Sequence, residues 1–206
     1  MYRSFGVLIT LIFVCLLAFL TGCATLNQSE CQVANWEIIG LEDGSAGRPS
    51  SYVGQHRSAC AEYGIVPDLD KYLLGHKKGL RQFCTYQNGF NLGNQGRSFS
   101  NVCPQELAGE FRRGFDRGYQ FYGLRSEIGQ LKSSIASHHD RLHHISTKIQ
   151  RHEDTIIAGN TSVESRRRLL NEIEELRHEQ DDIEHELPQL ERRLFELEDQ
   201  YERLNQ

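Results

Sequence analysis

The sequence predicts a mainly α-helical protein: a small disulfide-stapled, glycine- and aromatic-rich helical domain, followed by a long antiparallel coiled-coil hairpin. Three observations predict it. The part of this chain predicted to be exported keeps an even number of cysteines for disulfides. Glycines recur every four residues among aromatic residues, and the apolar residues of the second half recur at alternating steps of three and four. The formal net charge of −5 is mild and argues against a nucleic-acid partner.

The N-terminus has the features of an export signal. Gly6 to Leu20 are almost wholly apolar, which is about the length of a signal-peptide core and short for a spanning helix. The run ends in Leu20-Thr21-Gly22-Cys23, which resembles the bacterial lipobox. By that resemblance residues 1–22 are a cleaved lipoprotein signal peptide, although an uncleaved N-terminal anchor is the alternative. The resemblance also implies that Cys23 is acylated, with palmitate-type chains that anchor the protein stably. Ala24, where some sorting signals have Asp, favours the periplasmic face of the outer membrane.

Four cysteines remain for the exported domain, and they indicate two disulfides with three connectivities open. The short loops favour Cys31–Cys60 and Cys84–Cys103. No C-x-x-C pair occurs, so neither a zinc ribbon nor a thioredoxin-like redox motif is expected. We expect residues 23–30 to be a lipidated tether and residues 31–123 to be the disulfide-bonded domain.

A glycine pattern recurs within this domain. Residues 72–83 and 111–122 share the form aromatic-x-x-Gly-x-x-basic-Gly-apolar-x-x-aromatic, 39 residues apart. Gly40 and Gly44 repeat the four-residue glycine spacing in a less complete form. Glycine costs about 1 kcal/mol relative to alanine in a helix. Because several such glycines recur on one helix face, we predict helices that pack closely through these faces. This pattern favours a structural core over a ligand site.

The spacing of cysteine, glycine and aromatic residues resembles a widespread family of bacterial lipoprotein domains of unknown function. The residues that carry the resemblance are Trp36, Asp43-Gly44, Cys60, Tyr63-Gly64, Pro67-Asp68, Tyr72 to Cys84, Asn88-Gly89-Phe90, Gly93, Gly96 and Val102-Cys103-Pro104. The resemblance implies a periplasm-facing lipoprotein with a small disulfide-bonded domain. It implies no catalytic residue.

Residues 124–206 carry two heptad series, which predict a coiled coil. A turn near 158–162 joins them: Gly159 and Asn160 suit a helix C-terminus, and Thr161 to Glu164 fit a capping box. The first helix is expected to run from about Pro104 to Ile157. Folding the chain about Gly159 pairs the seam residues Ile145 with Ile173 and Phe121 with Leu197. It also brings together five pairs of opposite charge beside the seam: Glu127–Arg193, Arg141–Glu179 and Lys148–Glu172 at g positions, and Arg125–Glu191 and Lys132–Glu184 at e positions. Pro188 falls on the outer face.

Four histidines lie in the stretch SHHDRLHHIS, residues 137–146. In the predicted register His138 lies in the seam opposite Gln180, and the two form a polar layer that fixes the register. His139 and His143 have the i, i+4 spacing of a pair of metal ligands on a helix, and they are weak candidates for a metal site. Burying a protonated His138 would be costly, so the coil is expected to loosen in acid.

The function predicted from these features is that of a structural or interaction lipoprotein, anchored through Cys23, whose coiled-coil arm docks a protein partner or assembly of the cell envelope. A homo-oligomer is left open. The alternative is a periplasmic metal-binding lipoprotein that uses the histidine cluster. We expect no enzyme and no cofactor, because the chain lacks a nucleophile elbow and an H-E-x-x-H motif. Scattered polar residues such as Asp43, His56, Asp68 and His76 are expected to belong to loops and caps.

Overall fold

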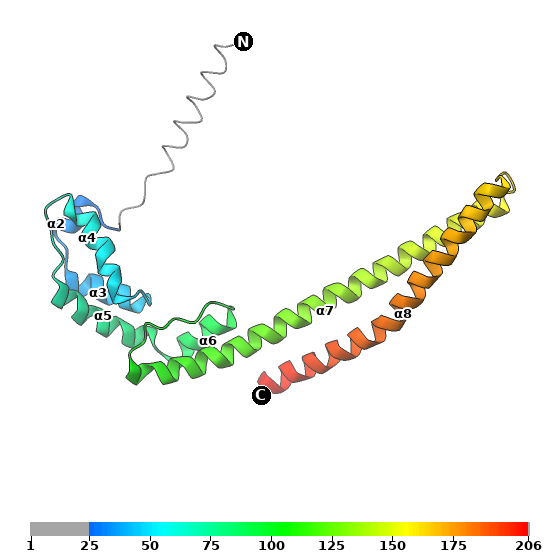
Figure 1. Cartoon of the computed structure of the whole chain (residues 1–206). Helices are drawn as coiled ribbons and strands as arrows, with labels where there is room; N and C mark the ends of the chain where they lie inside the picture. The colour runs from blue at the N-terminus through cyan, green and yellow to red at the C-terminus, as the bar shows by residue number, and fades with distance from the viewer. Residues whose placement is uncertain (1–24, 206) are drawn as a thin grey trace, which may run out of the picture. The chain divides into compact units, whose positions relative to one another are not determined.

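The computed structural model describes residues 25–205, and within them the chain is helical and has no strand (Figure 1). The helices are α2 (Gln28–Gln32), α3 (Trp36–Ser45), η1 (Ser50–Tyr52), α4 (Val53–Ala61), α5 (Leu69–Phe83), α6 (Tyr86–Asn94), α7 (Gln105–Ile157) and α8 (Val163–Asn205). Among these described helices, none has the length and apolar character needed to cross a membrane. The predicted signal peptide and Cys23 lie outside the described residues.

The chain divides into two compact units. Among the described residues, unit 1 consists of residues 25–89 and Phe99–Gly114, and unit 2 consists of Phe90–Ser98 and residues 115–205. The division differs from the expected boundary after residue 123, because the last part of the glycine-rich sequence groups with the coiled coil.

In unit 1, α3 and α5 lie parallel and touch backbone to backbone. A Cβ atom added to Gly40 or Gly44 would collide with backbone atoms of α5, and one added to Gly79 would collide with the carbonyl of Leu41. Both helices have side-chain N-caps, from Asn35 and Asp68. The predicted close packing through glycine faces is therefore confirmed.

Two disulfides staple unit 1: Cys31 is bonded to Cys60, and Cys84 to Cys103. This is the pairing that the short loops favoured. Cys31 and Cys60 are buried in one cluster with Trp36 and Tyr72. The first disulfide thus ties α2 and α4 into the core that covers the α3–α5 pair.

Unit 2 contains a second helix pair with the same contacts. A Cβ atom on Gly93 would collide with the carbonyl of Phe115 in α7, and one on Gly118 would collide with the carbonyl of Phe90 in α6. Gly96 has φ +70° and lies against the ring of Tyr122, just as Gly47, also with φ +70°, lies against Phe83 in unit 1. The chain therefore contains the same parallel helix pair twice.

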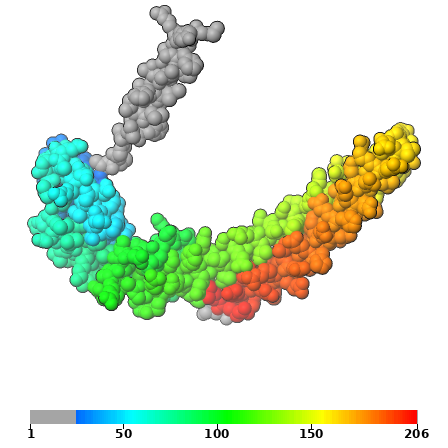
Figure 2. Space-filling view, in the orientation of Figure 1, coloured from blue at the N-terminus to red at the C-terminus, as the bar shows by residue number. Residues whose placement is uncertain are grey.

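The rest of unit 2 is the antiparallel hairpin of α7 and α8, whose helices lie alongside each other to the tip (Figures 1 and 2). The predicted seam positions are buried or half-buried throughout, and Pro188 is on the exposed face of α8. Gly159, with φ 74°, follows the end of α7 as predicted. The helix α8 is capped one residue later than expected, because Ser162 Oγ accepts from the Ser165 amide.

The flanking pairs at g positions agree with the predicted register. Arg141 binds Glu179, with Nε 2.6 Å from Oε1, and Arg193 Nη2 lies 3.0 Å from Glu127 Oε1. At the third such position, Glu172 lies beside His152 in place of the expected Lys148, with a distance of 3.1 Å.

The pairs at e positions show that the predicted register was wrong. Lys132 Nζ lies 2.7 Å from Glu198, two heptads beyond the expected Glu184. The partner of Glu191 is His139 at 4.0 Å in place of Arg125, which binds Asn94.

The seam itself is displaced by about one heptad, because the e pairs move by two heptads while the g pairs Glu127–Arg193 and Arg141–Glu179 do not move. Ile145 accordingly clusters with Leu176 and Ile183 in place of Ile173. The ring of Phe121 packs edge-on against Tyr201 in place of Leu197. The turn is also asymmetric about Gly159 in the same direction: α7 ends two residues before this glycine, and α8 begins four residues after it.

Candidate functional site: a buried polar network

A buried carboxylate lies at the centre of unit 1. Asp43, in the last turn of α3, is 2% exposed and accepts hydrogen bonds from three side chains. Arg48 Nη1 donates to Oδ1 over 2.8 Å, His56 Nε2 donates to Oδ2 over 2.8 Å, and the Tyr72 hydroxyl donates to Oδ2 over 2.7 Å. A carboxylate is tolerated at such depth when its oxygens are paired in this way.

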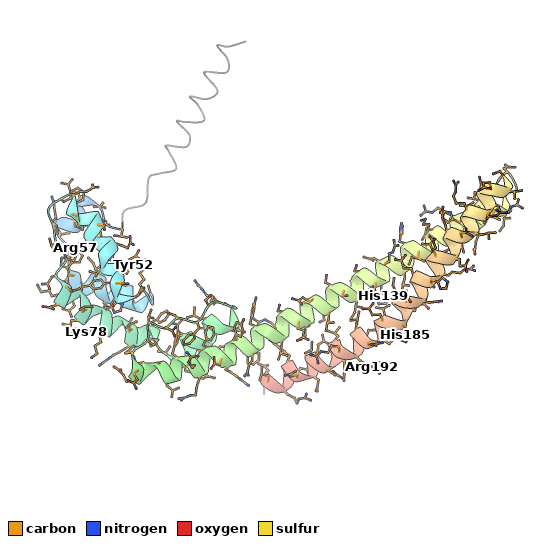
Figure 3. The ribbon with its side chains drawn as sticks, viewed as in Figure 1. Tyr52, Arg57, Lys78, His139, His185 and Arg192 are labelled. Carbon is orange, nitrogen blue, oxygen red and sulfur yellow. A yellow bond between two sulfur atoms is a disulfide. The ribbon has the colours of Figure 1, made fainter. Side chains whose placement is uncertain are left out.

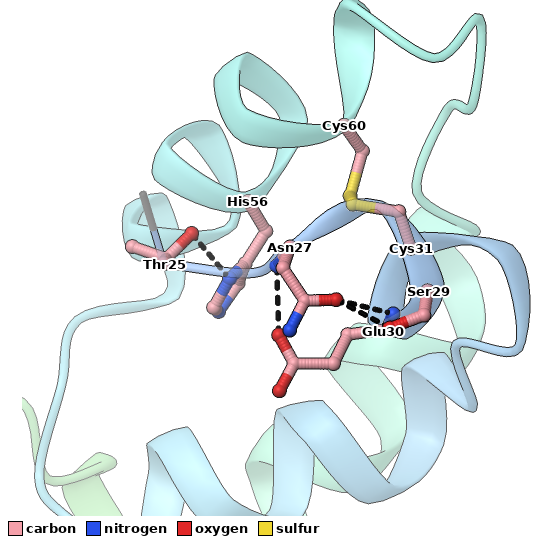
Figure 4. The surroundings of a disulfide bond; sticks show 7 residues. All are labelled: Thr25, Asn27, Ser29, Glu30, Cys31, His56 and Cys60. Carbon is pink, nitrogen blue, oxygen red and sulfur yellow. Dashed lines mark hydrogen bonds between the residues drawn. A yellow bond between two sulfur atoms is a disulfide. The ribbon is translucent and has the colours of Figure 1, made fainter. Parts of the chain in front are cut away.

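His56 extends the network from Asp43 to the beginning of the described chain. Because a carboxylate only accepts, His56 Nε2 carries the donated hydrogen. The other ring nitrogen, Nδ1, is hydrogen-bonded with the Thr25 hydroxyl over 3.0 Å (Figure 4). The imidazole of α4 thus joins a residue of the N-terminal segment to a carboxylate of α3.

Tyr72 and His76 complete the network on α5. Burial, together with the hydrogen bond to Asp43, raises the pKa of Tyr72 well above its ordinary value of 10.0. The phenol is therefore a donor at every physiological pH. The His76 ring is stacked on Tyr72, and its Nε2 donates to the Arg48 carbonyl over 2.8 Å.

Arg48 links the network to the surface. Its guanidinium is half-exposed and lies 4.4 Å from the centre of the Tyr52 ring, a cation–π arrangement. Tyr52, labelled in Figure 3, in turn contacts the His56 ring edge-on.

The segment that follows Thr25 is folded onto unit 1. Leu26 packs against the core cluster, and Asn27 and Glu30 form a reciprocal capping box at the start of α2 (Figure 4). Cys31 then closes the disulfide to α4. Residues 25–30, expected to be tether, are therefore part of the domain.

The second helix pair has apolar residues at the equivalent positions. The matching glycine contacts place Leu92 at the position of Asp43, and Phe115 at that of His76. The match between residues 72–83 and 111–122 places Phe111 at the position of Tyr72. Arg97 keeps the position of Arg48, since each arginine amide bonds the carbonyl five residues earlier. The same helix pairing thus forms without the polar network, whose presence in the first pair needs another explanation.

The histidine stretch of α7 forms no such network. His138 is the seam residue, as predicted, but its Nε2 lies 3.7 Å from Glu186, while Gln180 donates to Glu184 over 2.8 Å. The predicted polar layer of His138 with Gln180 was therefore wrong, because the displaced register puts the two in different layers. A protonated His138 would face a carboxylate, which removes the argument for acid loosening through this residue.

His139 and His143 are exposed on α7, and the side chain of His139 is the one labelled in Figure 3. Within residues 25–205, no group of three or more His, Cys, Asp or Glu side chains is arranged to hold a metal ion. No described contact therefore favours the metal-binding alternative.

The sequence interpretation gave Asp43, His56 and His76 no special role, and the structure corrects it for these three, which are buried. Asp68 is the N-cap of α5, as expected for such residues, and the backbone amide of Lys71 lowers the pKa of its carboxyl. A usable signal existed: Asp43 directly precedes a glycine of the helix-packing face, where the second copy has leucine.

Comparison with known proteins gives one result. Residues 35–120 match the family described as "Protein of unknown function (DUF2799)", which covers both glycine-paired helix pairs. This agrees with the domain of unknown function that the residue spacing resembles. Neither the curated proteins nor the solved structures gave a match.

Proposed function

We propose that the protein is a lipid-anchored, periplasm-facing interaction lipoprotein whose coiled-coil arm docks a protein partner of the cell envelope. In this proposal acylated Cys23 provides the anchor in the outer membrane. The disulfide-bonded domain provides the base, and the hairpin of α7 and α8 provides the docking element.

The observation that carries the proposal is the tip of the hairpin. Ile157 and Val163, the residues that end α7 and begin α8, are 80% and 76% exposed, and Leu170 of the next turns is half-exposed. Farther along, the flanks of the seam are bordered by ion pairs such as Arg177–Glu153 and Arg141–Glu179. Large exposed apolar side chains at the end of a rod whose flanks are bordered by ion pairs are a typical site of protein contact.

The two disulfides support an oxidising compartment. They agree with export through the apolar N-terminal run and with the lipobox-like Leu20-Thr21-Gly22-Cys23. The buried network around Asp43 supports a structural use of its histidines, since each one is held by hydrogen bonds inside the domain.

The test is crosslinking in living cells with a photoreactive amino acid at position 157 or 163. We expect the same discrete protein adduct from both positions. Position 195 is the matched control, because Phe195 is 72% exposed on α8, close to the values of the tip residues, but lies away from the tip. We expect Ile157→Asp with Val163→Asp to abolish the adduct and Phe195→Asp to leave it intact. If the adduct forms only from position 195, or persists in the tip variant, the tip is not the docking site.

A further inference from the structure

The feature that the proposed function leaves unused is the polar network of Thr25, His56 and Asp43. We infer that this network is a seat for the segment that follows the lipidated cysteine, and that it holds unit 1 directly against the lipid surface of the membrane. The inference rests on the proposed acylation of Cys23 and adds to it that no free tether separates lipid from domain.

The contacts of the segment carry the first step. Thr25 is hydrogen-bonded with the buried His56, Leu26 packs on the core, and Cys31 is disulfide-bonded to Cys60. Three different kinds of interaction thus fix seven consecutive residues, and two of the three end on α4. A segment that served only as a linker would need none of them.

The second helix pair carries the next step. There the positions of Asp43, Tyr72 and His76 hold Leu92, Phe111 and Phe115, so the pairing itself needs no polar interior. A buried carboxylate–imidazole pair costs more to desolvate than the apolar residues that replace it. In the first pair, this arrangement makes a hydrogen bond to Thr25. The second pair has no corresponding segment to bind, and it has no such polar arrangement.

Chain length then sets the distance to the membrane. Only Ala24 separates Cys23 from Thr25, and two residues span at most about 7 Å. The acyl chains attached to Cys23 must enter the bilayer, so the seat must lie within about that distance of its surface. Residues 23–30, as a free tether, would have allowed roughly 25 Å.

The exposed surface of α4 has a composition that suits a lipid boundary. The helix α4, whose buried His56 binds Thr25, lines a hollow of about 210 Å³ with Val53, Gly54 and Arg57, and Ser51, Val66, Pro67 and Leu69 complete the lining. Val66 and Leu69 are 69% and 51% exposed, and Arg57, labelled in Figure 3, is exposed beside them. Apolar side chains with a cation suit the boundary between acyl chains and phosphate headgroups. We therefore assign a lipid surface, and not a protein, as the partner of this face.

The test uses the full-length acylated protein in vesicles of phosphatidylethanolamine and phosphatidylglycerol whose acyl chains carry bromine, a quencher of tryptophan. Val66→Trp reports on the hollow, and Phe195→Trp on α8 is the control; the native Trp36, which is buried, is the common background. We expect the added fluorescence of Val66→Trp to fall about twofold, as for a side chain within the interfacial layer, and that of Phe195→Trp to stay unchanged.

Two changes then test the seat itself. A spacer of about 12 Gly and Ser residues between Ala24 and Thr25, with a root-mean-square span of roughly 20 Å, should abolish the quenching of Val66→Trp. Thr25→Val should raise amide exchange in residues 26–30 roughly fivefold, the effect of one net hydrogen bond. Ser58→Ala, which removes a hydroxyl of the same helix that donates to the Gly54 carbonyl, should leave that exchange unchanged.

The outcomes are distinguishable. A protein that does not float with the vesicles contradicts the proposed acylation. A protein that floats but shows no quenching at position 66, or stays quenched with the spacer, overturns the inference and leaves the acylation intact. Exchange in residues 26–30 that Thr25→Val does not change overturns the role of the network.

Discussion

The hydroxyl of Tyr72 donates a 2.7 Å hydrogen bond to Oδ2 of Asp43, and both residues are at most 2% exposed. The bond joins α3 to α5 at the point where their backbones are in contact. Asp43 also holds His56, so a change at this pair affects the whole network.

Removing either partner of this bond should therefore cost stability, and by unequal amounts. Tyr72→Phe should lower the free energy of unfolding by about 1.5–3 kcal/mol, the range for a hydrogen bond to a charged group. Asp43→Leu should cost about 3–5 kcal/mol, because it leaves His56 and Tyr72 without their acceptor.

The double variant Asp43→Leu/Tyr72→Phe imitates the second helix pair and should cost less than the sum of the two single changes. Denaturant unfolding of the oxidised protein measures all three variants. Strict additivity would show that the two side chains do not act together.

Close packing predicts opposite results for two glycines of α7. Gly118→Ala should destabilise the protein by about 3 kcal/mol or more, because its Cβ would meet the Phe90 carbonyl and a backbone cannot move aside cheaply. Gly129→Ala should stabilise it by about 0.5–1 kcal/mol, since nothing lies within 4 Å of the added atom. Thermal unfolding compares them, and equal shifts would contradict the close approach of α6 and α7.

The observed register predicts that His138 and Gln180 contribute independently. Their side chains bind different carboxylates, Glu186 and Glu184 respectively. His138→Leu and Gln180→Leu should each raise the free energy of unfolding by about 1 kcal/mol through added apolar burial. The double variant should be additive within a few tenths of a kcal/mol. A strong coupling in calorimetry would instead place the two in one layer.

The ion pairs of the arm predict a specific sensitivity to acid. Hydrogen bonds from Arg141 lower the pKa of Glu179 below its ordinary value of 4.5. A carboxyl whose pKa is lower in the folded state contributes stability above its unfolded pKa and loses it as the pH falls through the folded value. The melting temperature should therefore fall as the pH drops below about 4.5, and Glu179→Gln should weaken this dependence. A pH profile that Glu179→Gln leaves unchanged would contradict it.

The sequence predicts most of the fold because two of its repeating spacings, that of the glycines and that of the apolar residues, follow directly from helix geometry. Glycines four apart expose one helix face, and alternating steps of three and four define a seam, so Gly79 and Ile145 were placed correctly. The pairing level was wrong because displacing one helix by a heptad keeps every a residue opposite a d residue. The pairs Glu127–Arg193 and Arg141–Glu179 occur in both alignments, whereas the e pairs, such as Lys132 with Glu198, distinguish them.

The candidate site was harder to predict because no period connects its members. Thr25, Asp43 and His56 come from a bend, the end of α3 and the middle of α4. Their meeting depends on the Cys31–Cys60 disulfide and on how α4 covers the helix pair, which are tertiary features. Only the family-like spacing of residues 31–123 marked this part of the sequence as a domain, and the family match covers residues 35–120 of it.

The repeated helix pair also has an evolutionary consequence. Three pairs of glycines occupy equivalent contacts, Gly44 and Gly93, Gly47 and Gly96, and Gly79 and Gly118, and this is the arrangement that a tandem duplication of one short segment would produce. After such an event each copy is free to specialise. The first copy has an additional helix, α4, between its paired helices and ionisable residues in its interior, and each copy has one disulfide. The second became hydrophobic, and its last helix lengthened into the 53-residue α7.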